Sequence, residues 1–141
     1  MTRPLLPLAW VLALLTTTAE AATYYVATTG SEANPGTFSR PFRTVGKGVA
    51  VLSPGDTLYI RSGTYDEAGI NPPSGTSWSN AVTIARYQAE TVTFSRNFLN
   101  FYNSLAQYVV VDGIIFDCVG CSQSTDGMTI SNGTGPIRFV N

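Results

Sequence analysis

The sequence contains no histidine, which excludes Ser-His-Asp and Cys-His catalysis, histidine-ligated zinc and imidazole proton shuttles within these 141 residues. Charge is also scarce. Only 12% of residues are charged and the formal net charge is −1, so nothing in the composition favours nucleic acid or an anionic membrane as a partner. Because 44% of residues are hydrophobic and 13 are glycine, the composition favours strands and turns over charged surface helices.

Long hydrophobic runs are missing as well, apart from one at the N-terminus, residues 5–15. This run follows Arg3, and it is too short for a convincing membrane anchor, although an uncleaved anchor is the alternative interpretation. The small residues Ala19 and Ala21 then fit signal-peptidase cleavage after Ala21. We therefore expect residues 1–21 to be a signal peptide. Residues 22–141 are then expected to be secreted or periplasmic, monomeric and without membrane contact after cleavage.

Short apolar runs of three to five residues, separated by Gly, Asn, Pro, Ser and Asp, predict a series of strands. The runs are Thr57–Ile60, Val82–Ile84, Val92–Phe94, Tyr108–Val111, Ile114–Phe116, Met128–Ile130 and Ile137–Val140. With one inward residue per coil, Ile60 to Ile84 is 24 residues, Ile84 to Val110 or Val111 is 26 or 27, and Val111 to Ile130 is 19. An irregular period of this size is typical of a solenoid with stacked coils.

The dipeptide Asp112-Gly113 leaves a second interpretation open. It lies between two apolar runs, where it fits a hairpin with a type I′ turn. In a solenoid, the same two residues would form a corner between two strands of one coil. A small sandwich of this length would offer Ile115 and Phe116 a poor partner face, which favours the solenoid.

The two ends of this series differ. Residues 44–52 place Val45, Val49 and Leu52 on one face of a short helix that could cover the apolar end of a solenoid, although Gly46 and Gly48 each cost about 1 kcal/mol there. At the other end, the sequence stops inside a strand-like run, residues 137–141, without a covering segment. We therefore expect the chain to be a fragment of a longer protein.

Four motifs together resemble the N-terminal module of secreted right-handed parallel β-helix proteins of the pectate-lyase-like superfamily: Tyr24–Thr37, Pro41–Thr44, Pro54–Thr57 and Gly63–Tyr65. A fifth, Tyr108–Asp117, resembles one of their coils, in which a glycine corner joins two strands. The resemblance implies an all-β fold, a right-handed parallel β-helix with a short N-terminal capping helix, cut off at its C-terminus. It also implies a protein that acts on or binds polysaccharide, with polyuronate among the candidates. Members of the superfamily include polyuronate lyases that use calcium and a Lys or Arg base, glycoside hydrolases, epimerases and surface proteins with no known reaction.

The one concentration of aspartates in the sequence is Asp112, Asp117 and Asp126. Clustered carboxylates suit calcium, which neutralises a uronate carboxylate in lyase chemistry, so these three are the candidate metal ligands. The alternative is that they are ordinary turn residues, since Asp112 and Asp126 each precede a glycine.

Arg61 and Arg86 follow strand runs in adjacent coils and could line a groove that binds a substrate carboxylate, although solvated strand edges are the simpler interpretation. Trp78 lies in the polar loop 72–80 and is the best single candidate for an exposed sugar-stacking platform. Lys47 is the sole lysine and falls in the expected helix, where a solvated side chain is the simpler interpretation.

Cys118 and Cys121 form an isolated C-x-x-C motif, which lacks the second pair of a zinc site and the context of a thioredoxin fold. An exported location favours a local disulfide over two free thiols. Asn132 begins a glycosylation sequon, Asn132-Gly-Thr134, that matters only in a source with the machinery.

Two functions from different classes fit the sequence. The first is a polysaccharide lyase or glycoside hydrolase whose catalytic coils lie downstream of Asn141, and the second is a noncatalytic carbohydrate-binding or cell-surface β-helix protein. The fold hosts both kinds. Under either hypothesis, residues 22–141 alone are expected to be inactive.

Overall fold

A computed structural model describes residues 20–67, 69–95, 99–101, 106–117, 128–130 and 135–140. Most of the predicted signal peptide therefore lies outside the described residues. The same holds for four residues predicted to carry sites or modifications: Cys118, Cys121, Asp126 and Asn132.

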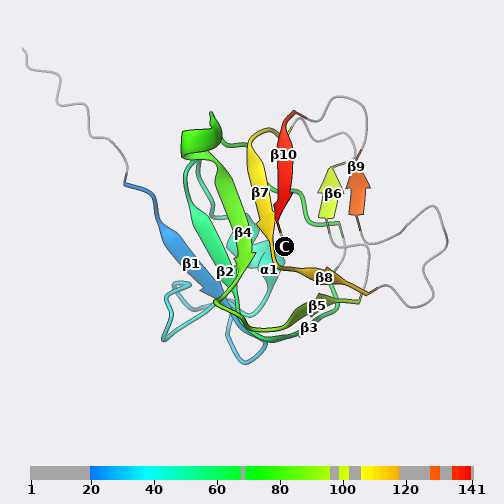
Figure 1. The fold of residues 1–141 in the computed structure, drawn as a ribbon. Helices are drawn as coiled ribbons and strands as arrows, with labels where there is room; N and C mark the ends of the chain where they lie inside the picture. The colour runs from blue at the N-terminus through cyan, green and yellow to red at the C-terminus, as the bar shows by residue number, and fades with distance from the viewer. Residues whose placement is uncertain are drawn as a thin grey trace, which may run out of the picture.

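The described residues form three sheets in which every strand pair is parallel (Figure 1). The five-stranded sheet runs in the order β1 (Thr23–Val26), β2 (Thr57–Ile60), β4 (Val82–Arg86), β7 (Val109–Asp112) and β10 (Ile137–Val140). A three-stranded sheet contains β3 (Gly63–Tyr65), β5 (Val92–Phe94) and β8 (Ile115–Phe116). The third sheet pairs β6 (Leu99–Phe101) with β9 (Met128–Ile130). The all-β prediction is confirmed.

The strand register corrects the predicted spacing. Leu58 pairs with Ile84, Ile84 with Val111 and Val111 with Phe139, so equivalent residues are 26, 27 and 28 positions apart. The prediction that Ile60 is equivalent to Ile84 was wrong by two residues. Leu58 and Ile60 both point inward, so the alternation alone does not tell which of them pairs with Ile84. The prediction that Ile130 follows Val111 was wrong too, since Ile130 belongs to β9 in a different sheet.

The hairpin at Asp112-Gly113 does not form. β7, before the turn, pairs in the five-stranded sheet, whereas β8, after it, pairs with β5 in the three-stranded sheet. Gly113 has a φ of +65°, a conformation that glycine adopts without strain. The dipeptide is therefore a corner between two sheets.

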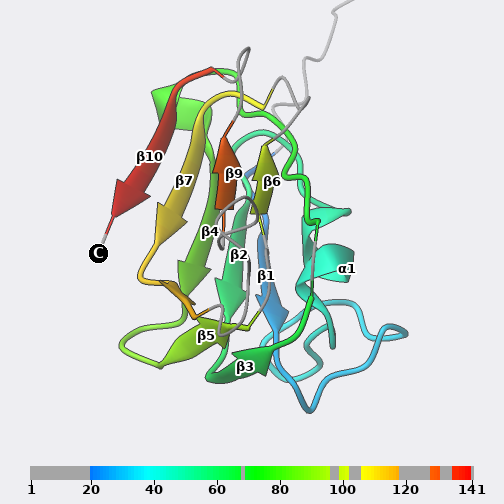
Figure 2. The same ribbon diagram turned by 90° about the vertical axis from the view of Figure 1, so that its right-hand side faces the viewer.

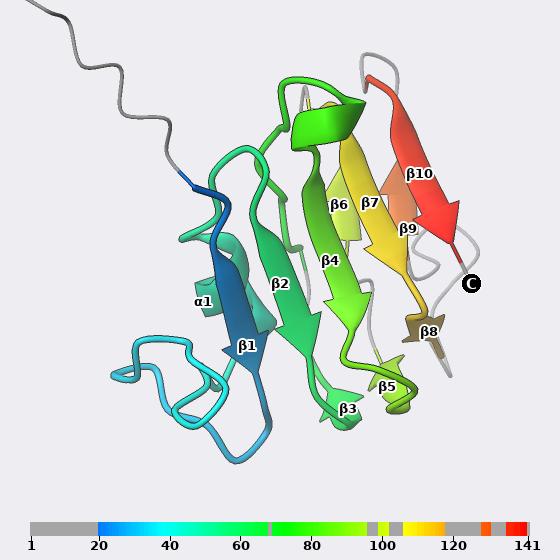
Figure 3. The same cartoon turned by 60° about the vertical axis from the view of Figure 1, so that its left-hand side comes forward.

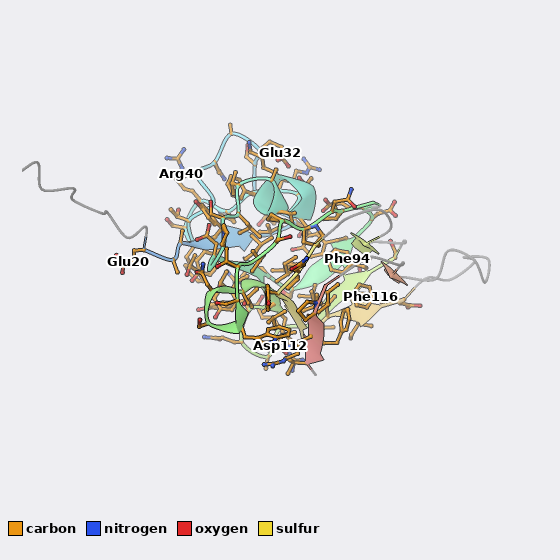
Figure 4. All side chains as sticks on the ribbon, turned by 90° about the horizontal axis from the view of Figure 1, so that it is seen from above. Glu20, Glu32, Arg40, Phe94, Asp112 and Phe116 are labelled. Carbon is orange, nitrogen blue, oxygen red and sulfur yellow. The ribbon has the colours of Figure 1, made fainter. Side chains whose placement is uncertain are left out.

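Alternate side chains of the five-stranded sheet point into one core. Leu58, Ile60, Ile84 and Val109 are fully buried there. On the three-stranded sheet, aromatic rings contact one another from strand to strand. The ring centroids of Tyr65 and Phe94 are 5.4 Å apart, and those of Phe94 and Phe116, both labelled in Figure 4, are 6.2 Å apart. Identical positions of successive strands thus bury apolar side chains against one another.

The helix α1 (Val45–Val49) lies within the segment where a helix was predicted and packs beside β1 and β2 (Figure 2). The Thr44 side chain accepts a hydrogen bond from the Lys47 backbone N–H, which fixes the N-terminal turn. The Glu67 carboxylate accepts two more, from Val45 N–H at 2.8 Å and Gly46 N–H at 2.9 Å. A side chain 21 residues away therefore supports a helix that two glycines weaken.

The loop that follows β1 folds back along the free edge of this strand (Figure 3). Phe42 donates its backbone N–H to the Tyr25 carbonyl at 2.9 Å and accepts from Ala27 N–H at 3.0 Å, while Tyr25 N–H donates to Gly36 at 2.7 Å. The edge of β1 is thereby covered, which blocks pairing with another chain. Gly30 lies against the Phe42 carbonyl with no room for a side chain.

Within the described residues, no helix is long and apolar enough to cross a membrane.

Candidate functional site

The surface of the five-stranded sheet opposite the core, here called the outer face, is turned to the viewer in Figure 3, with α1, β6 and β9 behind the sheet. Strand alternation places Tyr25 and Tyr59 on this face, and the register sets them side by side on β1 and β2. Ala85 continues the row on β4, and Asp112 follows on β7. The row thus passes from two aromatic rings through a small residue to a carboxylate.

Four aromatic rings gather at the end of this row and are called the aromatic platform: Tyr25, Phe38, Tyr59 and Tyr87. The centroid of the Tyr25 ring lies 5.4 Å from Phe38 and 5.7 Å from both Tyr59 and Tyr87. Phe38, from the loop after β1, is 50% exposed, and the three tyrosines are half-buried. Contacts at these distances are favourable and hold the rings in fixed orientations at the surface.

Arg61 lies over the aromatic platform. Its guanidinium carbon is 4.9 Å from the Phe38 ring centroid and 5.1 Å from that of Tyr87, within cation–π distance. Its Nε donates to both carboxylate oxygens of Glu90, at 2.9 and 3.0 Å. Glu90 also accepts from the Ser62 backbone N–H at 2.6 Å. The guanidinium is therefore fixed on one side by a carboxylate and on its face by two rings, and its terminal nitrogens carry further donors.

Trp78 forms a second aromatic group near the start of β4. It lies in the 3-10 helix η1 (Trp78–Asn80), is 41% exposed, and meets Tyr108 edge to face at 5.5 Å. The guanidinium carbon of Arg138, on β10, lies 4.4 Å from the centre of the indole. Trp78 thus has the exposure expected of a stacking platform, and an arginine already occupies one side of its ring.

The two predicted substrate-binding arginines are not brought together. In the register, Arg86 pairs with Ile60, the residue before Arg61, so their side chains leave opposite sides of the sheet. The Arg86 side chain lies against Gly113, where a β-carbon would overlap its Cγ and Cδ atoms. Arg61 belongs to the aromatic platform, whereas Arg86 packs at the corner after β7.

The predicted metal ligands are divided between sheets. Asp112 ends β7 in the five-stranded sheet, whereas Asp117 follows β8 in the three-stranded sheet and donates its backbone N–H to Phe94. The described part of the chain contains no group of three acidic, histidine or cysteine residues able to hold a metal ion. A calcium site therefore depends on Asp126, outside the described residues, and it stays a prediction.

A pocket of about 340 Å³ opens beside α1, at the end of the molecule that carries β1. It is lined by Thr28, Arg43, Thr44, Thr64, Tyr65, Asp66 and Glu67. Its volume is at the lower end of the range for small-ligand pockets. The lining thus combines one arginine, two carboxylates and the hydroxyl groups of three threonines and a tyrosine.

Tyr65 forms the buried wall of this pocket, and its hydroxyl donates to the Arg61 carbonyl at 2.9 Å. Burial raises the pKa of the Tyr65 hydroxyl well above its usual range, and the negative charges of Glu67 and Glu90 raise it further. The tyrosine therefore stays protonated at neutral pH and acts as a hydrogen-bond donor.

Several contacts around these residues were not predicted from the sequence. Phe38 comes from a loop without periodicity, and Glu90 and Arg138 act as partners of Arg61 and Trp78 across 29 and 60 positions. The sequence could have indicated only one of these features, the shared face of Tyr25 and Tyr59. Both residues lie mid-strand and alternate with buried residues, so both point outward.

A family model and a Bacillus subtilis protein each match part of the chain. The family model described as "Protein of unknown function (DUF1565)" matches residues 28–71, which include all seven residues that line the pocket. A Bacillus subtilis (strain 168) protein described as "Uncharacterized protein YwoF" is 38% identical over 71 residues, which cover 50% of this chain and 15% of that protein.

Two solved structures are similar. One, described as "Rhamnogalacturonan lyase", has a TM-score of 0.51 and 22% identity, and the match covers 68% of this chain and 28% of that one. The other, "The complex structure of XylC with xylose", has a TM-score of 0.49 and 35% identity, covering 50% of this chain and 11% of that one. The chain thus spans less than a third of the length of each of these relatives.

Proposed function

We propose that this chain is the N-terminal part of a secreted or periplasmic right-handed parallel β-helix protein that acts on polysaccharide. In this proposal, α1 caps the first coil and the outer face contacts the sugar chain. Three parallel sheets with equivalent residues 26 to 28 positions apart support the solenoid. The likeness to the rhamnogalacturonan lyase structure supports the fold.

The observation that carries the carbohydrate assignment is the aromatic platform with Arg61 fixed over it. The C–H faces of sugar rings pack on aromatic rings, and preset rings bind with little loss of side-chain entropy. A guanidinium beside them can donate two hydrogen bonds to a carboxylate. The combination favours an acidic polysaccharide, such as a polyuronate, over a neutral one.

The reaction class is part of the proposal. A polysaccharide lyase or glycoside hydrolase with its catalytic residues on coils beyond residue 141 is the first candidate, with calcium as the ion that would neutralise a uronate carboxylate. The second candidate is a noncatalytic carbohydrate-binding or cell-surface protein. The noncatalytic candidate is favoured by the chemistry of the platform. Its rings contact one another and form a surface for stacking, and they supply no pair of a general acid and a general base.

A binding measurement tests the platform. We expect the full-length protein to bind polygalacturonate in affinity electrophoresis, and Tyr59→Ala to weaken the affinity about tenfold or more, as loss of a ring contact implies. Val110→Ala on the same face is the matched control, because it shortens an outer-face side chain outside the platform. Equal affinities of the wild type, Tyr59→Ala and Val110→Ala would show that sugar does not bind on the platform.

An activity measurement separates the two candidates. The full-length protein is incubated with a panel of polyuronates and neutral polysaccharides, with calcium or with a chelator, and unsaturated products and reducing ends are measured. Product formation supports the enzyme. Binding without any product supports the noncatalytic protein.

A further inference from the structure

Asp56 carries a buried carboxylate, with 5% of the residue exposed. Its Oδ1 accepts a hydrogen bond from the backbone N–H of Ala22 at 2.7 Å, and its Oδ2 accepts from Ser53 N–H at 2.8 Å. Both donors are uncharged peptide groups. Asp56 thus closes the turn Ser53–Asp56 and ties it to the residue before β1.

This carboxylate has no cationic partner in the part of the chain that the structure describes, where the ion pair joins Arg61 and Glu90. Burying an ionised carboxylate is unfavourable unless hydrogen bonds and an opposite charge compensate for lost hydration. Two short hydrogen bonds supply the first of these compensations. The opposite charge has no source among the described residues of the unprocessed chain.

The sequence predicts where a cation would arise. Cleavage after Ala21 would turn the nitrogen of Ala22 into an α-amino group, which is largely protonated at neutral pH. That nitrogen is the atom already 2.7 Å from Asp56 Oδ1. Its position is set from the other side as well, because the Ala22 carbonyl accepts from Thr57 N–H at 2.9 Å and Thr23 pairs with Thr57.

We propose that the bond between Ala21 and Ala22 is a maturation site whose cleavage completes a partly buried ion pair between the new Ala22 ammonium and Asp56. The inference rests on the proposed export of the protein. Cleavage replaces one neutral N–H donor by a charged group with three N–H donors at the same place, and charge-assisted hydrogen bonds of this kind are about twice as strong. The mature protein is therefore more stable than its precursor. Cleavage one residue later would remove Ala22 and the pair with it.

Acetylation of the α-amino group tests the ion pair. At neutral pH this group reacts in preference to lysine side chains, because its pKa is lower than theirs, and a Lys47→Arg background removes the one lysine of residues 1–141. Acetylation removes the charge but keeps one N–H donor, and therefore isolates the ion pair from the hydrogen bond. The full precursor is expressed in an exporting host, the N-terminal residue is read by mass spectrometry, and urea unfolding is followed before and after acetylation.

We expect the exported protein to begin at Ala22 and acetylation to lower its folding equilibrium constant about tenfold or more. In Asp56→Asn, acetylation should change this constant less than twofold, and the wild-type comparison stands even if that variant does not fold. An N-terminus at another residue would contradict the proposed cleavage and export. A protein that begins at Ala22 but is equally stable with and without the acetyl group would overturn the ion pair while leaving export intact.

Discussion

Gly48 lies so close to Leu58 that a β-carbon on it would be 2.7 Å from Leu58 Cδ1 and 3.0 Å from Val26 Cγ2. The helix α1 therefore contacts the core through bare backbone. The two glycines that weaken the helix are not equivalent. A β-carbon on Gly46 would meet only the tip of Ile70, at 3.2 Å, and Glu67 Oε2, at 3.4 Å.

We predict opposite effects of alanine at these two positions. Gly48→Ala should lower the free energy of unfolding by about 1 to 3 kcal/mol, because overpacking outweighs the gain of about 1 kcal/mol in helix propensity. Gly46→Ala should be neutral or slightly stabilising, since the end of the Ile70 side chain can move. Urea unfolding of both variants checks this. Stabilisation by Gly48→Ala would show that α1 lies farther from the core than described.

The sequence predicts the strands well and their partners poorly. Thr57–Ile60 and Val92–Phe94 were predicted with the observed bounds, because alternation and turn residues are local signals. The register is not local: Ile84 pairs with Leu58 and not with Ile60, because the loops between the strands vary in length. Met128–Ile130 was predicted as a strand but assigned to the wrong sheet for the same reason.

The candidate site was predictable in part. Arg61 and Trp78 were singled out because charged and aromatic residues beside short strands are candidates for binding. Their partners, Glu90 and Arg138, were not, because those contacts depend on the register and on loop paths. Arg86 carries the same sequence signal as Arg61 and lies elsewhere, since a shift of one residue on a strand changes the face.

A second prediction concerns the corner after β7. Gly113→Ala places a β-carbon at a φ of +65° and against Arg86, whereas Gly69→Ala has a φ of +70° and open space around it. The free energy of unfolding of both variants should fall by about 1 kcal/mol through backbone strain. That of Gly113→Ala should fall by about 1 kcal/mol more, through the overlap with Arg86. The added Arg86→Ala substitution should restore that extra loss. If the double variant loses as much free energy of unfolding as the two single variants lose together, Arg86 does not lie across Gly113.

A third prediction separates charge from shape at the aromatic platform. Arg61→Lys keeps the positive charge but loses the planar group that stacks on Phe38 and Tyr87 and the Nε that both oxygens of Glu90 accept from. We expect this variant to bind polygalacturonate about tenfold more weakly than the wild type. Arg40→Lys, on the exposed loop after β1, should leave the affinity unchanged. If Arg61→Lys binds as well as the wild type, net charge alone accounts for the interaction.

A fourth prediction follows from the raised pKa of Tyr65. The unfolded chain loses this proton near pH 10, while the folded protein keeps it, so the stability that Tyr65 contributes is complete below pH 10 and falls as the pH rises further. Below pH 9, Tyr65→Phe should be about 1 kcal/mol less stable than the wild type, through loss of the hydrogen bond to the Arg61 carbonyl. Above pH 10 this gap should close by up to about 1.4 kcal/mol per pH unit. Urea unfolding from pH 8 to 11 measures it, with Tyr59→Phe on the outer face as the control. A gap that stays constant over this range would mean that the Tyr65 hydroxyl is hydrated in the folded protein.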